Sequence, residues 1–157
     1  YAYAPIDSGR GDLIVLRGRA PTHPITRGGA RRMGSGNVRY WSICAYPEPP
    51  DRTAACIADE DIPLGRDREY VIVAGPADKR PANARAACGI AWLPLPAAGP
   101  GFLLLRHVAP DANFTFTPAR ATTTYAAPTL GPFTPNGTYR SIIDVETIGC
   151  PVRHMDR

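Results

Sequence analysis

The sequence has almost no lysine and no long apolar run. Lys79 is the only lysine, so arginine carries nearly all of the positive charge, and the formal net charge is +4. The most apolar segment, GFLLLRHV, is interrupted by Arg106 long before the roughly 20 residues that a helix needs to cross a membrane. We therefore expect no transmembrane segment. The arginine bias, together with abundant Ala, Pro and Gly, is typical of a GC-rich genome and does not indicate a nucleic-acid function.

Motifs that carry chemistry are also missing. The cysteines form no CxxC pair, and the histidines, His23, His107 and His154, do not stand at zinc-finger spacing. There is no Ser-His-Asp order, phosphate loop or nucleotide fingerprint. We therefore predict no metal, no cofactor and no catalytic residue, which favours a binding protein over an enzyme. A carboxylate pair for glycoside hydrolysis stays open, because its geometry cannot be read in one dimension.

The sequence contains an even set of cysteines, Cys44, Cys56, Cys88 and Cys150. Without metal or catalytic spacing, four cysteines indicate two disulfides, which form in exported proteins. Of the three pairings, we favour Cys44–Cys56, which closes a Pro-rich loop, and Cys88–Cys150, which ties the C-terminal segment to the middle of the domain. The sequence also begins at Tyr1 rather than at Met, so we expect that a leader has been removed from an exported precursor.

Proline and glycine are frequent and evenly spread, with 18 and 15 residues. This spacing favours short strands and turns over long helices. Five runs show strand-like patterns: residues 12–18, 38–46, 69–75, 88–95 and 101–108. We predict an all-β fold, a single-domain β-sandwich or jelly roll with at most short helical turns. Residues 1–10 would form an extended N-terminal arm, and residues 11–157 the β domain.

The C-terminal third of the sequence contains three further structural signals. Residues 113–118 predict a strand with Phe114 and Phe116 on one face. Residues 138–148 fit either a strand or a short helix, because apolar residues recur at both periods. The dipeptide Asn136-Gly137 predicts a hairpin turn.

The candidate binding residues are aromatic. Trp41, Trp92 and His107 could line a ligand pocket, with Asp59, Asp61 or Glu69 as acidic partners of the histidine. The competing interpretations are core packing for the two tryptophans and a hydrogen-bonded histidine at the rim of the sheet for His107. In the N-terminal stretch YAYAPIDSG, Tyr1 and Tyr3 could add to a partner's open sheet edge, because Pro5 leaves the segment little to gain from its own domain. The alternative is a frayed terminus.

Several polar clusters have ordinary interpretations. The arginines Arg27, Arg31, Arg32 and Arg39 indicate a solvated glycine-rich loop rather than a nucleic-acid arm, since no aromatic residues alternate with them. The tripeptide Arg10-Gly11-Asp12 indicates a turn before a strand rather than an adhesion motif. The run Asp59-Glu60-Asp61, together with Asp67, indicates an acidic turn rather than a calcium site.

Three segments together resemble a known group of proteins. They are GDLIVLRGRAPTHP, then MGSGNVRYWSIC with AACIADEDIPL, then the stretch from REYVIVAGPADKRP to GFLLLRHVAP. This order resembles a poorly characterised family of exported bacterial proteins that is common in actinobacteria. It is also distantly similar to the C-terminal, jelly-roll-like domain of an uncharacterised two-domain envelope family. The resemblance spans about residues 11–110 and implies the fold and export, but no catalytic residue.

These observations lead to one functional hypothesis with two alternatives. We expect an exported structural or accessory protein that binds a protein partner, or a neighbouring copy, in the cell envelope or outside the cell. The first alternative is a small-molecule or glycan-binding jelly roll, and the second is a hydrolase.

Overall fold

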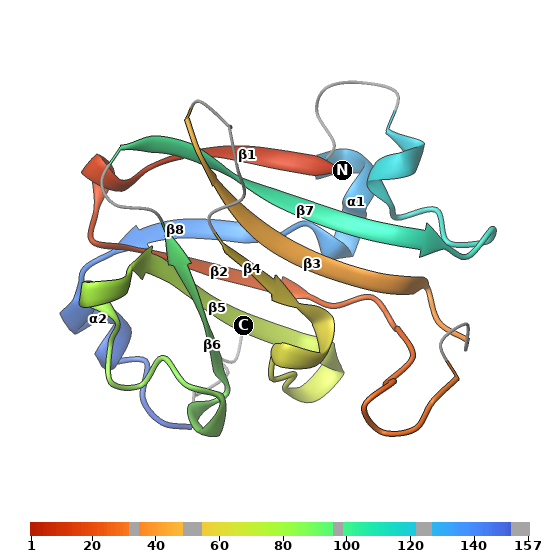
Figure 1. Cartoon of the computed structure of the whole chain (residues 1–157), viewed down its shortest axis with the longest axis horizontal. Helices are drawn as coiled ribbons and strands as arrows, with labels where there is room; N and C mark the ends of the chain where they lie inside the picture. The colour runs from red at the N-terminus through yellow and green to blue at the C-terminus, as the bar shows by residue number, and fades with distance from the viewer. Residues whose placement is uncertain (32–34, 49–54, 96–98, 122–126, 152–157) are drawn as a thin grey trace.

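The computed structural model describes residues 1–31, 35–48, 55–95, 99–121 and 127–151 (Figure 1). The strands are β1 (Ala2–Asp7), β2 (Leu13–Arg19), β3 (Val38–Pro47), β4 (Ala55–Ala58), β5 (Glu69–Pro76), β6 (Ile90–Leu95), β7 (Pro100–Pro110) and β8 (Asn136–Arg140). The α-helices are α1 (Ala127–Leu130) and α2 (Ile142–Glu146), and the 3-10 helices are η1 (Ser8–Arg10), η2 (Asp59–Asp61), η3 (Arg66–Arg68), η4 (Ala77–Lys79), η5 (Ala86–Cys88), η6 (Pro118–Arg120) and η7 (Gly131–Phe133). In the described residues, no helix is long and apolar enough to cross a membrane.

The strands form two four-stranded sheets, so the predicted all-β sandwich is confirmed. One sheet has the order β1-β7-β3-β4 and the other β6-β5-β2-β8. Neighbouring strands are antiparallel except β5 and β6, which run parallel. Each of the five runs predicted as strands from their pattern overlaps a strand of the structure over most of its length.

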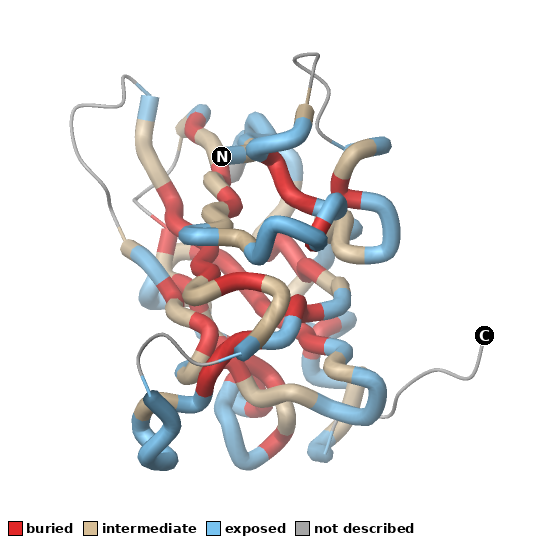
Figure 2. The backbone as a smooth tube through the Cα atoms, turned by 90° about the vertical axis from the view of Figure 1, so that its right-hand side faces the viewer, coloured by how far each residue is buried: buried red, intermediate tan, exposed pale blue. Residues whose placement is uncertain are grey.

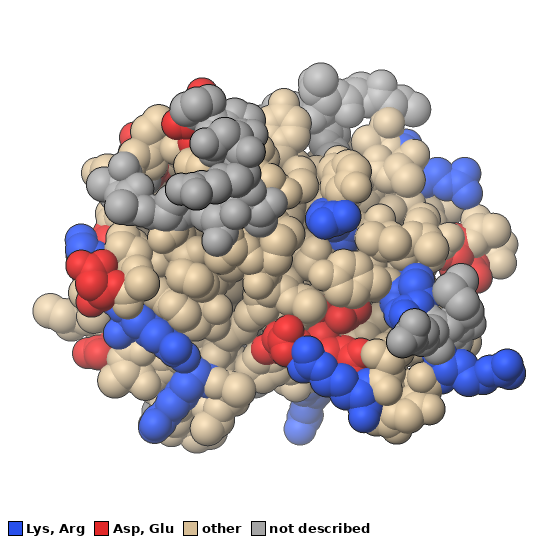
Figure 3. Space-filling view, in the orientation of Figure 1, with Lys and Arg blue, Asp and Glu red and all other residues tan. Residues whose placement is uncertain are grey.

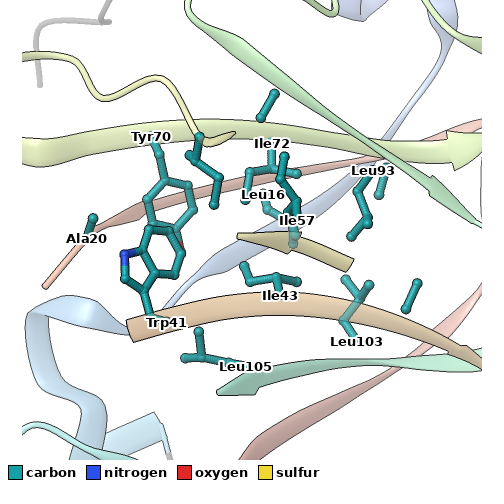
Figure 4. Packing of buried hydrophobic residues seen from close by; sticks show 14 of the residues in the cluster. Leu16, Ala20, Trp41, Ile43, Ile57, Tyr70, Ile72, Leu93, Leu103 and Leu105 are labelled. Atoms are coloured by element: carbon teal, nitrogen blue, oxygen red, sulfur yellow. The ribbon is translucent and has the colours of Figure 1, made fainter. Parts of the chain in front are cut away.

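The main core lies between the two sheets, where alternate residues of each strand point inward. Trp41 and Ile43 of β3 face Tyr70 and Ile72 of β5 across this space, and the Trp41 and Tyr70 rings lie 5.3 Å apart (Figure 4). Figure 2 shows the buried segments gathered in the middle of the molecule with exposed segments around them.

A second apolar cluster covers the opposite side of the β6-β5-β2-β8 sheet. Leu13, Val15, Val71, Val73 and Ile90 point away from the main core and pack with Val145 of α2. The Asn83 side-chain amide donates a hydrogen bond of 2.8 Å to the Val145 carbonyl. The outer side of this sheet is therefore buried by the protein's own C-terminal segment.

Both expected disulfides are present. Cys44 and Cys56 stand directly opposite one another on β3 and β4. Cys88 and Cys150 join η5 to the residues that follow α2. Cys44 is therefore a structural residue, and the disulfides suggest an oxidising environment.

The C-terminal third corrects two expectations and decides a third. Residues 113–118 form turns instead of a strand, although Phe114 is buried. Asn136 and Gly137 begin β8, which pairs with β2, and do not form a hairpin turn. The ambiguous stretch 138–148 contains both alternatives, the end of β8 and then α2. Ser141 separates them by accepting a hydrogen bond from the Asp144 backbone N–H, while the Asp144 carboxylate accepts one from the Ser141 N–H.

The N-terminal segment also differs from expectation. It is extended, but Ala2–Asp7 pairs along its whole length with β7 of its own domain, Pro5 included. The Asp7 N–H donates to the Tyr139 hydroxyl at 2.9 Å, so it points away from β7. By strand alternation the Pro5 nitrogen points the same way, where its missing N–H costs no ladder bond. An edge that lacks this donor is a poor template for strand addition.

Candidate functional site

The outer side of the β1-β7-β3-β4 sheet is unusually rich in aromatic and aliphatic side chains. The inward positions of its strands belong to the main core, so the alternate positions point outward. We call the following outward residues the aromatic face: Tyr3, Tyr40, Tyr46, Phe102, Leu104, Arg106 and Val108. A sheet that only meets water carries mostly polar residues on that side.

The aromatic face is organised in rows across the sheet. Tyr40 lies beside Val108, and Tyr46 lies beside Phe102. The Tyr46 and Phe102 rings stack at 4.9 Å, and the Tyr3 ring meets Phe102 edge-on at 6.3 Å. Tyr3 is 68% exposed and Val108 is 37% exposed, so contact area is available at both ends.

Arg106 is the one charged side chain at the described outward positions between these two rows. Its guanidinium carbon lies 5.3 Å from the centre of the Tyr1 ring, and its Nε is buried without a hydrogen-bond partner. Figure 3 shows β3 and β7 from their outer side as a broad uncharged surface with an isolated basic side chain. The face therefore presents a positive charge in apolar surroundings.

A hollow of about 400 Å³ lies at the end of the aromatic face nearest η2. Tyr40, Val108 and Ala58 form its apolar wall, and Thr26, Arg27, Arg39, Asp59 and Glu60 form the rest. Most of the polar groups are already bonded within the protein. The Glu60 carboxylate accepts from the Thr26 hydroxyl and from the Arg27 backbone N–H, the latter at 2.9 Å, and these bonds lower the pKa of Glu60.

The remaining charges around the hollow follow the same pattern. Arg27 forms an ion pair with Asp61, which raises the pKa of the guanidinium. Asp59 is buried and accepts from the backbone N–H groups of Trp41 and Glu60. The buried His23 has its Nδ1 3.5 Å from the Asp59 carboxylate. These acids hold the 22–27 loop in place, and no described acid is paired with Arg39.

The three predicted ligand residues do not form one open pocket. Trp41 and His107 stand opposite each other on β3 and β7, but both point toward the core, and Trp41 is only 1% exposed. Trp92 belongs to the second cluster, beyond the other sheet, where the Arg80 guanidinium lies over its ring. Burial lowers the pKa of His107 to about 4, so this imidazole is neutral at pH 7. Core packing describes Trp41 better than a pocket does.

The acids proposed as partners of His107 lie elsewhere. Asp59 is next to His23, Asp61 holds Arg27, and Glu69 begins β5 in the other sheet. Within the described part of the chain, the geometry thus offers no histidine–carboxylate pair that a substrate could reach, because His23 and Asp59 are both buried.

The Arg10-Gly11-Asp12 tripeptide is tied to its own domain. Arg10 lies over the Tyr139 ring, and the Asp12 carboxylate accepts from Lys79 at 2.7 Å. These contacts fit the interpretation as a turn. Arg32 of the arginine cluster lies outside the described residues, and so does His154.

The sequence did not lead us to expect surface positions for Phe102, Leu104, Arg106 and Val108. A signal was present, because residues 102–105 are apolar at every position rather than at alternate ones. Such a run is typical of a strand that is covered on both sides. In the structure the inward side of β7 is buried in the main core, whereas on the outward side Phe102, Leu104 and Arg106 are half-buried and Val108 is exposed.

No known protein family matches the chain, and no curated protein sequence matches it. Among solved structures, a crystal structure of the VPA0106 protein from Vibrio parahaemolyticus is similar over 72% of this chain, with 17% sequence identity and a TM-score of 0.43. The matched region is 27% of that protein's length. A likeness this remote says nothing about function.

Proposed function

We propose that this chain is an exported accessory β-domain that binds a protein partner through the aromatic face, and that it performs no catalysis. The observation that supports this most strongly is the composition of the face. Between the Tyr40–Val108 row and the Tyr46–Phe102 row, the outward positions are aromatic, aliphatic, small or Arg106. Tyr, Phe and Arg are enriched at protein interfaces, and Lys, Glu and Asp are depleted there.

The two sides of the sandwich support the same conclusion by contrast. The outer side of the β6-β5-β2-β8 sheet is covered by α2 and pinned by the Cys88–Cys150 disulfide. On the other sheet, the exposed apolar residues would stabilise a complex, because the free energy falls when a partner removes them from water. Rigid aromatic side chains lose little conformational freedom on binding, which favours them as contact residues.

Export is supported by the cysteines and by the sequence resemblance. Two disulfides joining all four cysteines require an oxidising compartment to form and persist. The resemblance to exported bacterial β-domains points the same way. The partner would then be found in the cell envelope or outside the cell.

Site-specific photo-crosslinking in the producing organism tests the proposal. A benzoyl-phenylalanine at Tyr40 should crosslink to one discrete protein, because Tyr40 lies on the aromatic face. The same probe at Ile143 is the matched control, since Ile143 is 74% exposed but lies on α2, on the opposite side of the molecule. Absence of a Tyr40 product, or the same products from both positions, would contradict the proposal.

The captured protein must then bind the purified chain. Val108→Asp should weaken that binding at least tenfold, whereas Ile143→Asp should leave it unchanged, with the melting temperature of both variants as the folding control. If binding responds equally to both substitutions, the aromatic face is not the interface. A small molecule or glycan bound in the hollow, with no protein captured, would favour the alternative function.

A further inference from the structure

We infer that the aromatic face binds an extended peptide segment of its partner, with an apolar anchor in the hollow and a carboxylate two residues away on Arg106. This inference rests on the proposed function and adds the chemistry of the partner. It comes from three features of the face: the spacing of its rows, the apolar wall of the hollow, and the isolated charge of Arg106.

The row spacing matches an extended peptide. Successive outward residues of β7, Val108, Arg106, Leu104 and Phe102, are two positions apart. Two residues of a strand advance about 6.6 Å, and side chains on one side of an extended peptide repeat at the same interval. A peptide lying along β3 and β7 can therefore place residue i over the hollow and residue i+2 over Arg106. Residues i+4 and i+6 then meet Leu104 and Phe102.

The hollow selects an apolar anchor. Apart from Arg39, its polar wall is already bonded internally, because Glu60 accepts from Thr26 and Arg27 and because Arg27 pairs with Asp61. Its other wall consists of Tyr40, Val108 and Ala58, which need no polar partner. An aromatic or branched aliphatic side chain contacts that wall without leaving any of these polar groups unpaired.

Arg106 selects the acid. It lies one row from the hollow, and no described acidic side chain is paired with it. Its Nε is buried, so a carboxylate of the peptide would accept charge-assisted hydrogen bonds from the two outer nitrogens of the guanidinium. The chain's net charge of +4 attracts an acidic segment as well. Arg39 lines the hollow itself and, like Arg106, has no acidic partner among the described residues, so it provides a charge-matched control.

Selection from a phage-displayed library of random linear 12-residue peptides on the immobilised full chain tests the inference. We expect enriched peptides that carry Asp or Glu two positions from an aromatic or branched aliphatic residue. The best peptide, labelled with fluorescein, should bind Arg106→Gln at least tenfold more weakly than wild type. Arg39→Gln, which removes the same charge, should change the Kd less than threefold.

A peptide with Gln in place of its acidic residue completes the cycle. It should bind wild type at least tenfold more weakly than the parent peptide does. The two peptides should bind Arg106→Gln with equal affinity, because that variant has no guanidinium for the acidic residue of the parent peptide. The inference fails if no peptide is enriched, if the enriched peptides lack the acid, or if the acid preference follows Arg39. The crosslinking at Tyr40 remains an independent test, so failure here leaves the proposed function standing and failure there does not depend on peptides.

Discussion

At the scale of single residues, burial decides what the candidate side chains can do. His107 is the clearest case, because its neutral imidazole lies next to Phe114 with their ring centres 6.1 Å apart. Burial lowers the pKa of His107 from 6.5 to about 4 in the folded protein. Between pH 4 and pH 6.5, His107 is protonated in the unfolded chain but neutral in the folded protein. The contribution of His107 to folding stability is therefore complete above about pH 6.5 and is lost as the pH drops toward 4.

We therefore expect His107→Phe to reduce the fall in the free energy of unfolding between pH 6.5 and pH 4. Wild type should lose about 2 to 3 kcal/mol through this group between pH 6.5 and 4, and the variant should not. Urea denaturation at pH 7 and at pH 4.5 measures the difference. Parallel losses in the two proteins would show that His107 titrates normally.

At the scale of elements, the disulfides and one hydrogen bond hold the edges of the sandwich. Cys88–Cys150 closes a separation of 62 residues and Cys44–Cys56 one of 12. On the chain-entropy model the longer link stabilises by about 4 kcal/mol and the shorter by about 3 kcal/mol. Replacing each pair by alanine should lower the free energy of unfolding in that order, and unreduced protein should show no free thiol when denatured. An equal or reversed order, or reactive thiols, would contradict this account.

The N-terminal strand offers a second test at this scale. The Tyr139 hydroxyl accepts the Asp7 N–H and so joins β1 to the other sheet. Tyr139→Phe keeps the ring that Arg10 covers and removes only this acceptor. We expect a loss of about 1 kcal/mol and faster amide exchange at Asp7. Unchanged exchange there would mean that β1 is held by β7 alone.

At the scale of the whole molecule, charge and surface composition point to a protein partner rather than a nucleic acid. Arg27 is neutralised by Asp61, and the aromatic face contributes only Arg106. We expect a labelled 20-base-pair DNA to bind weakly and to dissociate at about 150 mM salt, because few phosphates are contacted. Fluorescence anisotropy in a salt titration measures this. Salt-resistant binding that disappears in Arg31→Ala/Arg32→Ala would overturn the prediction.

The sequence by itself determined the local structure of this protein. Two-residue alternation placed Trp41 and Ile43 opposite Tyr40 and Tyr46, because successive side chains of a strand point to opposite sides. Frequent proline and glycine favoured an all-β fold, and an even cysteine count indicated two disulfides. Where local signals competed, as in residues 138–148, alternation and helical period were both present, and the capping of α2 by Ser141 decided between them.

Only the tertiary structure decided which side of each strand meets solvent and which distant residues become neighbours. Val108 lies beside Tyr40 across a sequence separation that no periodicity encodes, because strand order and register depend on contacts throughout the sandwich. The same contacts placed Trp41 in the core, covered one sheet with α2, and left Arg106 among aromatic rings on the other. The candidate site is a product of those long-range pairings, which is why its residues could not be identified from the chain alone.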